Sequence, residues 1–251
     1  MKFIELLFFI WRNRKIITVM SSIKLFFANS KASKICKIYF KKYPYQFYLR
    51  TSTTDKSIFI NTFLIKQHPA INNNTNILVD IGANIGAVSF LYKMQNPNIN
   101  IIAVEPDKSN CVMYKKNMHY FNNVELIETA VHNTEGIQMY LENPTSGSSG
   151  FRYAENINKA KYNSTISTSI NQIIKNYGLN KIDVVKIDIE GGEKILFQKN
   201  LDWLKITDKL IIELHDHYVD GCSTNLIKAL SQYELKLKWM GENLIITFKN
   251  R

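Results

Sequence analysis

Short apolar runs and stretches with helical spacing alternate along residues 77–248. Runs of about four to eight residues rich in Ile, Val and Leu are typical of buried strands, and apolar positions that recur every three or four residues are typical of helices. These patterns predict strands at 77–81, 100–105, 124–128, 136–141, 182–188, 209–214, 235–240 and 243–248, and helices at 86–95, 109–121, 168–177, 192–199 and 223–233. Such alternation predicts a mostly parallel α/β sheet. Only "GEN" joins the last two strands, so the last strand should run antiparallel.

The residues before this alternation differ in character. An apolar stretch at Phe3–Trp11 and further apolar positions up to Phe27 at helical spacing predict an amphipathic helix or a pair of helices. The segments "YQFYLR" and "SIFINTF", separated by the polar "TSTTDK", predict a small extended cap at 49–71. The polar "NNNTN" predicts a loop from the cap to the sheet. We therefore divide the chain into an N-terminal segment, 1–48, and a domain, 49–251.

Positive charge is concentrated near the N-terminus. Residues 1–50 hold 11 of the 32 Lys and Arg residues and one of the 21 acidic residues, Glu5. The rest is nearly neutral, so the net charge of +11 does not indicate a nucleic-acid-binding catalytic domain, which should be basic around its own site. Two interpretations remain open: the apolar side of the segment packs on its own domain or on a second subunit of a homo-oligomer, or residues 1–42 attach to anionic membrane. Binding of this segment to nucleic acid is the third interpretation, after these two.

The chain shows neither a membrane-spanning nor a secretory pattern. Phe3–Trp11 is far shorter than the roughly 20 residues needed to span a bilayer. Glu5 interrupts it, and no small-residue cleavage site follows promptly. Cys36, Cys111 and Cys222 are far apart and match no disulfide framework or metal-ligand spacing, which favours a reducing compartment. We therefore expect a cytoplasmic protein, with peripheral attachment to the inner membrane face as one option.

The sequence "ILVDIGANIGAVSF" at 77–90 predicts a strand, a tight turn and the start of a helix. Glycines let the backbone approach a ligand, and a helix start leaves N–H groups unpaired, but dinucleotide dehydrogenases and methyltransferases both use such a turn. Glu105, followed by Pro106, ends the next strand and is placed to accept hydrogen bonds from ribose hydroxyls. The competing interpretation is a solvent-facing glutamate. Position alone places Thr129 and Ala130, after the third strand, beside an adenine.

Charged side chains at the ends of two later strands form a second candidate group. The sequences "VVKIDIEGGEKIL" and "LIIELHDHY" supply Lys186, Asp188, Glu190, Glu213, His215, Asp216 and His217. Ligands of an open α/β sheet bind outside the carboxyl ends of its strands, so this group should face the same crevice as Asp80 and Glu105. The competing interpretation of the histidines is hydrogen-bonded filling of a loop.

The ordered motifs "VDIGANIG", "AVEPD", "KIDIEGGE" and "IIELHDH" resemble those of the FkbM-type S-adenosylmethionine-dependent methyltransferases, and "LRTSTTDKSIF" is similar to the family's upstream motif. The resemblance runs from Leu49 to Phe248. It implies a Rossmann-like class I methyltransferase fold, with a mostly parallel seven-stranded sheet whose last strand is antiparallel, and leaves 1–48 as a helical appendage. Gly192 stands where the family commonly has alanine, a small change that should not abolish cofactor binding.

The resemblance implies S-adenosylmethionine as cofactor and assigns site residues. The loop around the methionine part would comprise Asp80, Gly82, Asn84 and Gly86, and the rest of the cofactor set would be Glu105 at the ribose, Pro106, Thr129, Ala130 and, beneath the sulfonium, Asp188. The family counterparts of Arg50, Thr54 and Asp55 lie near the pocket without a firm role.

The resemblance also implies O-methylation, often of sugars or natural-product hydroxyls. A hydroxyl is a poor nucleophile near neutral pH, so we expect His215 to act as general base or a divalent metal to be held by Asp188 and Glu213. His217 and Asp216 are competing bases. We expect a small-molecule or glycan acceptor, and a cytoplasmic enzyme with a basic amphipathic N-terminus fits a glycan precursor or lipid-linked glycan at the inner membrane face. The alternatives are an RNA methyltransferase that docks through its N-terminus and a catalytically silent binding module of this fold.

Overall fold

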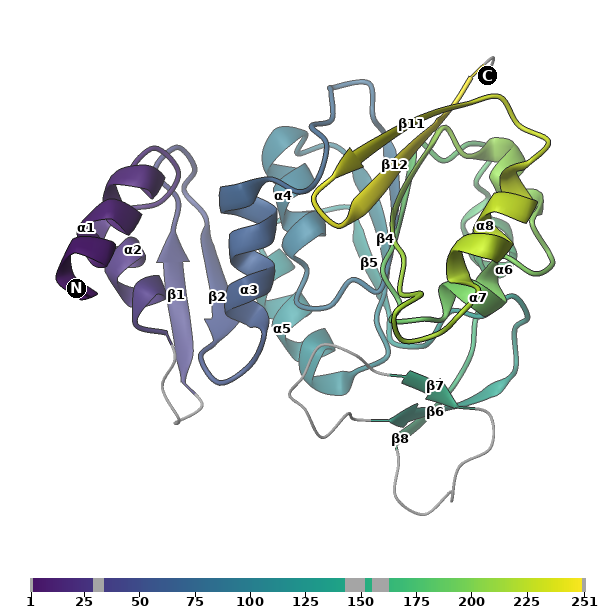
Figure 1. Ribbon diagram of the computed structural model, residues 1–251, viewed down its shortest axis with the longest axis horizontal. Helices are drawn as coiled ribbons and strands as arrows, with labels where there is room; N and C mark the ends of the chain where they lie inside the picture. Colours follow the sequence, from purple (N-terminus) through teal and green to yellow (C-terminus); the bar gives the residue numbers. More distant parts are fainter. Residues whose placement is uncertain (1, 29–33, 143–151, 155–162, 250–251) are drawn as a thin grey trace.

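A seven-stranded sheet forms the centre of the computed structural model, which describes residues 2–28, 34–142, 152–154 and 163–249 (Figure 1). In spatial order its strands are β11 (Leu235–Met240), β12 (Asn243–Phe248), β10 (Lys209–Glu213), β9 (Val184–Ile187), β3 (Ile77–Ile81), β4 (Asn100–Val104) and β5 (Val124–Ile127). The strands from β10 to β5 are parallel, and β12 runs antiparallel to both β10 and β11. The predicted mostly parallel sheet with an antiparallel last strand is confirmed.

Helices cover both faces of this sheet (Figure 1). One side carries α4 (Ala87–Gln95) and α5 (Lys108–Met118), and the other carries α6 (Ile170–Tyr177), α7 (Glu193–Leu196), α8 (Cys222–Leu230) and the short 3₁₀ helix η2 (Asp202–Ile206). Neighbouring residues of one strand enter different cores: Leu78 packs with the first set and Val79 with the second. Because both faces are buried, these strands read as continuous apolar runs.

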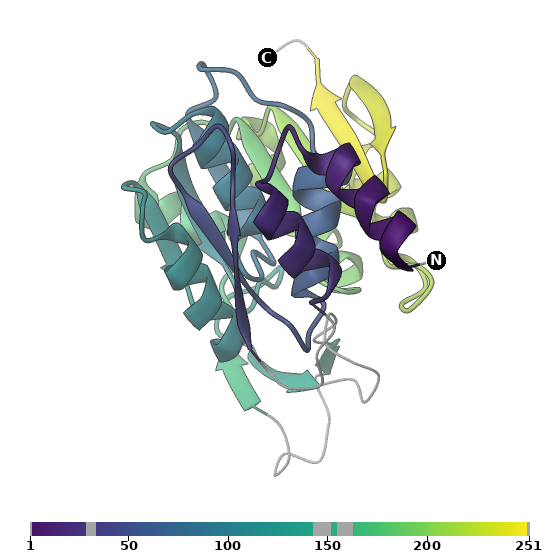
Figure 2. The same ribbon diagram turned by 90° about the vertical axis from the view of Figure 1, so that its left-hand side faces the viewer.

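The N-terminal residues pack on the α4–α5 side (Figure 2). They form the expected helix pair, α1 (Lys2–Asn13) and α2 (Val19–Phe26), and a hairpin of β1 (Ile35–Tyr39) and β2 (Gln46–Arg50). Ile17 and Leu25 are fully buried in the same core as Phe90 of α4. The boundary drawn between residues 48 and 49 falls inside β2. Among the described residues, no helix has the length and apolarity needed to cross a bilayer.

The segment "SIFINTF", predicted to be extended, is helical instead. It lies in α3 (Asp55–Phe59) and the π-helical segment η1 (Ile60–Ile65). Phe59 and Phe63, four residues apart, both enter the core around Phe90, and this spacing fits one face of a helix. Tertiary packing therefore overrides the strand preference of the β-branched and aromatic residues here.

The strand predicted at 136–141 lies outside the main sheet. It corresponds to β6 (Gln138–Glu142), which pairs antiparallel with β7 (Arg152–Ala154) and β8 (Asn163–Ile166) in a three-stranded sheet at the lower edge of Figure 1. The seven strands of the main sheet are thus the other seven predicted ones.

Candidate active site

A pocket of about 220 Å³ opens at the carboxyl ends of β3, β4, β9 and β10. Its walls are the turns after these strands, α3 with η1, and the turn between β11 and β12. Eight of the residues singled out in the sequence line it together: Thr54, Gly82, Asn84, Glu105, Pro106, Asp188, Glu190 and Glu213. The pocket thus lies at the edge of the sheet where the sheet rule predicts a ligand.

Gly82 brings the turn after β3 against the turn after β9. Its φ is +74°, and a Cβ on it would lie 1.8 Å from the backbone oxygen of Asp188. Lys186 Nζ donates a hydrogen bond to the Gly82 carbonyl at 2.6 Å and ties the turn to β9. Only a residue without a side chain permits this close approach at the pocket wall.

Asp80 and Gly86 belong to the same motif but lie behind the turn. Asp80 is fully buried, and its Oδ2 accepts a hydrogen bond from Ser89 Oγ at 2.6 Å while its Oδ1 lies 3.5 Å from Lys186 Nζ. Gly86 has a φ of +83°, and a Cβ there would lie 2.9 Å from the Tyr114 ring. These two residues shape the turn from beneath and are not part of the pocket lining.

Glu105 lies at the pocket wall with only 4% of its surface exposed. Its carboxylate accepts hydrogen bonds from the backbone N–H groups of Asn84 at 2.8 Å and Asp107 at 2.9 Å, and from the Asn110 side chain at 3.3 Å. Burial raises the pKa of Glu105 to about 7, although these hydrogen bonds oppose the shift. A carboxylate has about four acceptor positions, so one remains for a ligand.

Arg50 connects the upstream motif to Glu105. Its guanidinium donates to both carboxylate oxygens of Asp55, at 2.9 and 2.8 Å, and to Asn110 Oδ1 at 2.7 Å. Asn110 in turn donates to Glu105. The neighbouring Thr54 lines the pocket. The upstream motif therefore holds the wall of the pocket in place.

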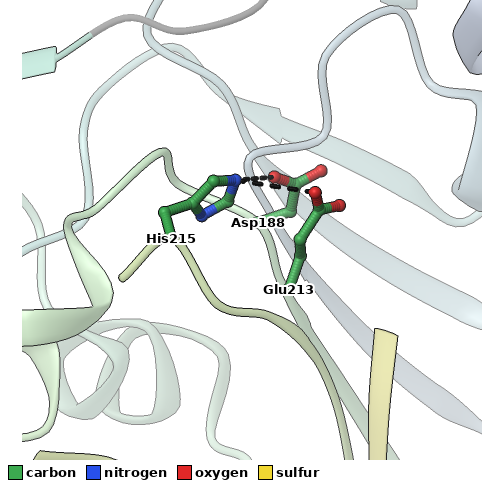
Figure 3. A group of neighbouring side chains, drawn as sticks. All are labelled: Asp188, Glu213 and His215. Carbon is green, nitrogen blue, oxygen red and sulfur yellow. Dashed lines mark ion pairs between the residues drawn. The ribbon is translucent and has the colours of Figure 1, made fainter. Parts of the chain in front are cut away.

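His215 lies among carboxylates and is only 3% exposed (Figure 3). Its Nδ1 is 3.1 Å from Glu193 Oε1. Three carboxylates surround its Nε2: Glu190 Oε2 at 3.5 Å, Glu213 Oε1 at 3.7 Å and Asp188 Oδ1 at 3.9 Å. Burial alone would lower the pKa of His215, but Glu193 and then Asp188 and Glu190 raise it to about 9. A pKa above neutrality favours the protonated imidazole, which has no lone pair with which to act as a base.

The acids beside His215 are shifted toward their uncharged form, whereas His215 is shifted toward its charged form. Burial, followed by the negative charge of Asp188, raises the pKa of both Glu190 and Glu213 to about 7. Glu190 also has a φ of +52°, a conformation that is uncommon for a residue with a side chain and is often found at functional sites. Carboxyl groups with pKa values near neutrality are suited to accept and release protons at physiological pH.

Four further sequence candidates also lie outside the pocket lining. The Asp216 carboxylate accepts hydrogen bonds from Ser223 at the start of α8, and His217 is exposed and contacts the Tyr218 ring. Thr129 donates a hydrogen bond to the Ile166 carbonyl beside β8, and Ala130 is fully buried.

Glu193, the buried partner of His215, and two pocket residues, Asn61 and Glu242, were not selected from the sequence. Glu193 follows the two glycines of "IEGGE", just as Glu190 precedes them, so its spacing was a usable signal. Asn61 and Glu242 carried no such signal, because they come from η1 and from the turn between β11 and β12. Only the tertiary fold brings these two segments to the pocket.

A seven-stranded sheet of this order, with a pocket at the carboxyl ends of its central strands, defines a Rossmann-like methyltransferase. A sequence profile of the FkbM methyltransferase domain matches residues 80–235, more than half of the chain. The chain belongs to the FkbM methyltransferase family.

Solved structures resemble the chain only remotely. No curated protein sequence matches the chain. Similar solved structures include methyltransferase FkbM from Methylobacillus flagellatus KT (15% identity, TM-score 0.47, covering 76% of this chain and 47% of that one), a putative caffeoyl-CoA O-methyltransferase from Staphylococcus aureus (13%, 0.46, 71% and 78%) and M. jannaschii TYW2 in complex with AdoMet (13%, 0.45, 87% and 87%). The chain spans about half the length of the first of these.

Proposed function

We propose that the protein is an S-adenosylmethionine-dependent O-methyltransferase that acts on a hydroxyl group of a sugar or glycan precursor. The observation that carries this proposal is the charge of the pocket. Its acidic lining residues are Glu105, Asp188, Glu190, Glu213 and Glu242, and among the described residues no lysine or arginine lines the same pocket. A sulfonium is a permanent cation, so such a pocket favours S-adenosylmethionine over NAD, whose pyrophosphate is anionic.

The residues present fit this cofactor. Gly82 and Asn84 bring backbone to the pocket wall, and Glu105 keeps one acceptor position for a ribose hydroxyl. Asp188 supplies a carboxylate on the facing turn. S-adenosylmethionine carries an activated methyl group, so the chain has mainly to orient the acceptor and take its proton.

We propose that Glu190 accepts the proton of the acceptor hydroxyl. A hydroxyl must lose its proton as it is methylated, and a base with a pKa near the working pH does this best. Glu190 lines the pocket and has a pKa of about 7, whereas His215 does not belong to the pocket lining.

The acidic pocket also separates the candidate acceptors. A sugar hydroxyl is neutral and can donate hydrogen bonds to carboxylates, whereas the phosphates of RNA would be repelled. The pocket therefore supports a neutral hydroxyl acceptor over RNA, and the transfer assay below separates an enzyme from a catalytically silent module.

The N-terminal helix supports an acceptor at a membrane surface. The exposed apolar side chains of α1 share one side of the helix, with exposed fractions between 50% and 72%: Phe3, Ile4, Leu7, Phe8 and Trp11. Basic residues follow directly at Arg12, Arg14 and Lys15. We propose that α1 lies in the interface of an anionic membrane, because apolar burial and attraction to anionic lipid act together in such helices.

A second cavity, of about 620 Å³, supports a lipid-linked acceptor. Its apolar lining includes Phe40, Phe63 and Leu91, and its lysines are Lys15, Lys42 and Lys66. This combination suits an apolar chain with an anionic head group. His68 lines this cavity and also a smaller one that reaches Asp188 and Glu213, so the two regions are neighbours.

Transfer of a labelled methyl group tests the proposed function. The protein is incubated with labelled S-adenosylmethionine and with separated cell fractions of glycans, lipids and RNA. Label in glycans or lipid-linked glycans, reduced at least tenfold by Glu190→Gln and unchanged by the surface variant Glu128→Gln, would support it. Label in RNA alone, or in no fraction, would contradict it.

A further inference from the structure

Three metal-ligating side chains converge at one edge of the pocket (Figure 3). Asp188 follows β9, Glu213 ends β10 and His215 comes two residues later, so the ends of two adjacent parallel strands bring them together. His215 Nε2 lies 3.9 Å from Asp188 Oδ1 and 3.7 Å from Glu213 Oε1, and one ligand atom from each residue lies within 4.8 Å of the others. Ligands about 2.1 Å from one ion are at most about 4.2 Å apart. A small movement of the two carboxylates toward each other would bring all three ligand atoms within reach of one ion.

The orientation of His215 provides a second, independent observation. Its ring is almost fully buried, and Nδ1 lies 3.1 Å from Oε1 of the fully buried Glu193. The backbone N–H groups of Ile189 and Gly191 donate to the Glu193 carboxylate, both at 3.0 Å, and fix its position. A neutral imidazole that donates its Nδ1 hydrogen to Glu193 directs its Nε2 lone pair toward Asp188 and Glu213, with Glu190 also 3.5 Å from this nitrogen. A carboxylate that orients a histidine in this way is the usual outer partner of a metal-bound histidine.

Asp188 Oδ1, Glu213 Oε1 and an unprotonated His215 Nε2 present lone pairs to one another. A positive charge between these three atoms would remove their repulsion. Lys186 lies 3.5 Å from the other oxygen of Asp188 and is also engaged by Asp80 and the Gly82 carbonyl. Within the described part of the chain, no lysine or arginine forms an ion pair with Glu213. A bound cation would supply this charge, and otherwise a proton shared among these groups must take its place.

We propose that Asp188, Glu213 and His215 bind one divalent cation of the Mg²⁺ and Mn²⁺ class. Two carboxylates suit both ions, and the imidazole favours Mn²⁺ of the two. Asp188 and Glu213 also line the pocket, so the remaining coordination positions face the acceptor. The binding site stands on its own geometry. Its use to hold the acceptor oxygen and lower the pKa of its hydroxyl rests on the proposed function.

Mn²⁺ binding to the full-length protein, without cofactor or acceptor, tests the site. Electron paramagnetic resonance measures free Mn²⁺ during a titration. The wild type should bind one Mn²⁺, and Glu213→Gln and His215→Gln should each weaken binding at least tenfold. Glu193→Gln should weaken it roughly 10–100-fold through the orientation of His215. The matched control is Glu242→Gln, which removes a carboxylate from the same pocket but outside the three ligands and should change the affinity less than about threefold.

Two results would overturn the site. One is wild-type affinity in Glu213→Gln, a half-buried position whose substitution should leave the fold intact. The other is no wild-type binding below millimolar Mn²⁺, in which case a proton on His215 supplies the charge. Methyl transfer that is unaffected by metal removal would leave the methyltransferase function standing and refute the catalytic use of the cation. Mn²⁺ binding without transfer into any fraction would leave the site standing and refute the proposed function.

Discussion

The Glu105 carboxylate accepts a hydrogen bond from the backbone N–H of Asn84 at 2.8 Å and so joins the end of β4 to the turn after β3. Glu105→Ala should weaken binding of the demethylated cofactor roughly 10–100-fold, because a hydrogen bond to a charged group contributes about 1.5–3 kcal/mol. Isothermal calorimetry measures this. The control is Glu128→Ala, which removes an exposed acid that pairs with Lys115. Unchanged affinity in Glu105→Ala would place the ribose contact elsewhere.

Gly82 and Gly136 form a matched pair for the close approach at the pocket wall. Both have positive φ, +74° and +79°, but a Cβ on Gly136 would meet nothing within 4 Å. Gly136→Ala should therefore lower the free energy of unfolding by about 1–2 kcal/mol, because the only penalty is a left-handed backbone at a residue with a side chain. Gly82→Ala should cost clearly more and abolish cofactor binding, since the new carbon would overlap the Asp188 carbonyl. Urea unfolding and calorimetry compare the two, and equal losses would show that the contact is unimportant.

The sequence predicted the main sheet well because its strands are buried on both faces and read as unbroken apolar runs. It predicted α3 and η1 wrongly, because Ile58, Phe59 and Ile60 favour strands when taken alone. Their helical form depends on contacts such as those of Phe59 with Phe40 and Phe47, which the chain makes only after folding. Local preference could not reveal those partners.

The sequence likewise predicted one part of the candidate site and could not predict the other. Glu105, Asp188 and Glu213 follow strand ends, and the sheet rule alone brings them to one pocket. The rule does not say which way a side chain points, so it could not tell that Asp80 lies beneath the turn. Nor could it give the protonation of His215, which depends on the buried Glu193.

His68 should make the stability of the protein depend on pH. Burial, and then the charge of Lys186, lowers the pKa of His68 to about 4, below its usual value of about 6.5 in an unfolded chain. As pH falls from 6.5 to 4, the unfolded state takes up this proton before the folded state does, so stability is lost across that window. Between pH 7 and pH 4.5, the free energy of unfolding of His68→Gln should fall less than that of the wild type, by at most about 3 kcal/mol. Urea unfolding at both values measures it, with the exposed His119→Gln as control. Equal losses in wild type and His68→Gln would contradict the burial argument.

The exposed side of α1 should determine vesicle binding. Removal of residues 1–42 is a poor test, because Ile17 and Leu25 are part of the shared core. Phe8→Ser with Trp11→Ser removes two exposed side chains and should reduce flotation with anionic vesicles at least fivefold, with little effect on neutral vesicles or stability. The control is Ile227→Ser on α8, an apolar residue that is 68% exposed. Undiminished flotation of the double variant would favour another contact surface.

Arg50 should affect cofactor binding from outside the pocket. Its guanidinium holds both oxygens of the buried Asp55 and also Asn110, which donates to Glu105. Arg50→Lys keeps the charge but cannot form this fork, so it should lower the free energy of unfolding by about 1–3 kcal/mol. The cofactor affinity should fall roughly three- to tenfold, because Asn110 loses its partner and no longer orients Glu105. Urea unfolding and calorimetry measure the two effects. The control is Lys115→Gln, which breaks an exposed ion pair and should leave the free energy of unfolding nearly unchanged. A loss of stability in Arg50→Lys with unchanged cofactor affinity would show that Glu105 is held in place without the upstream motif.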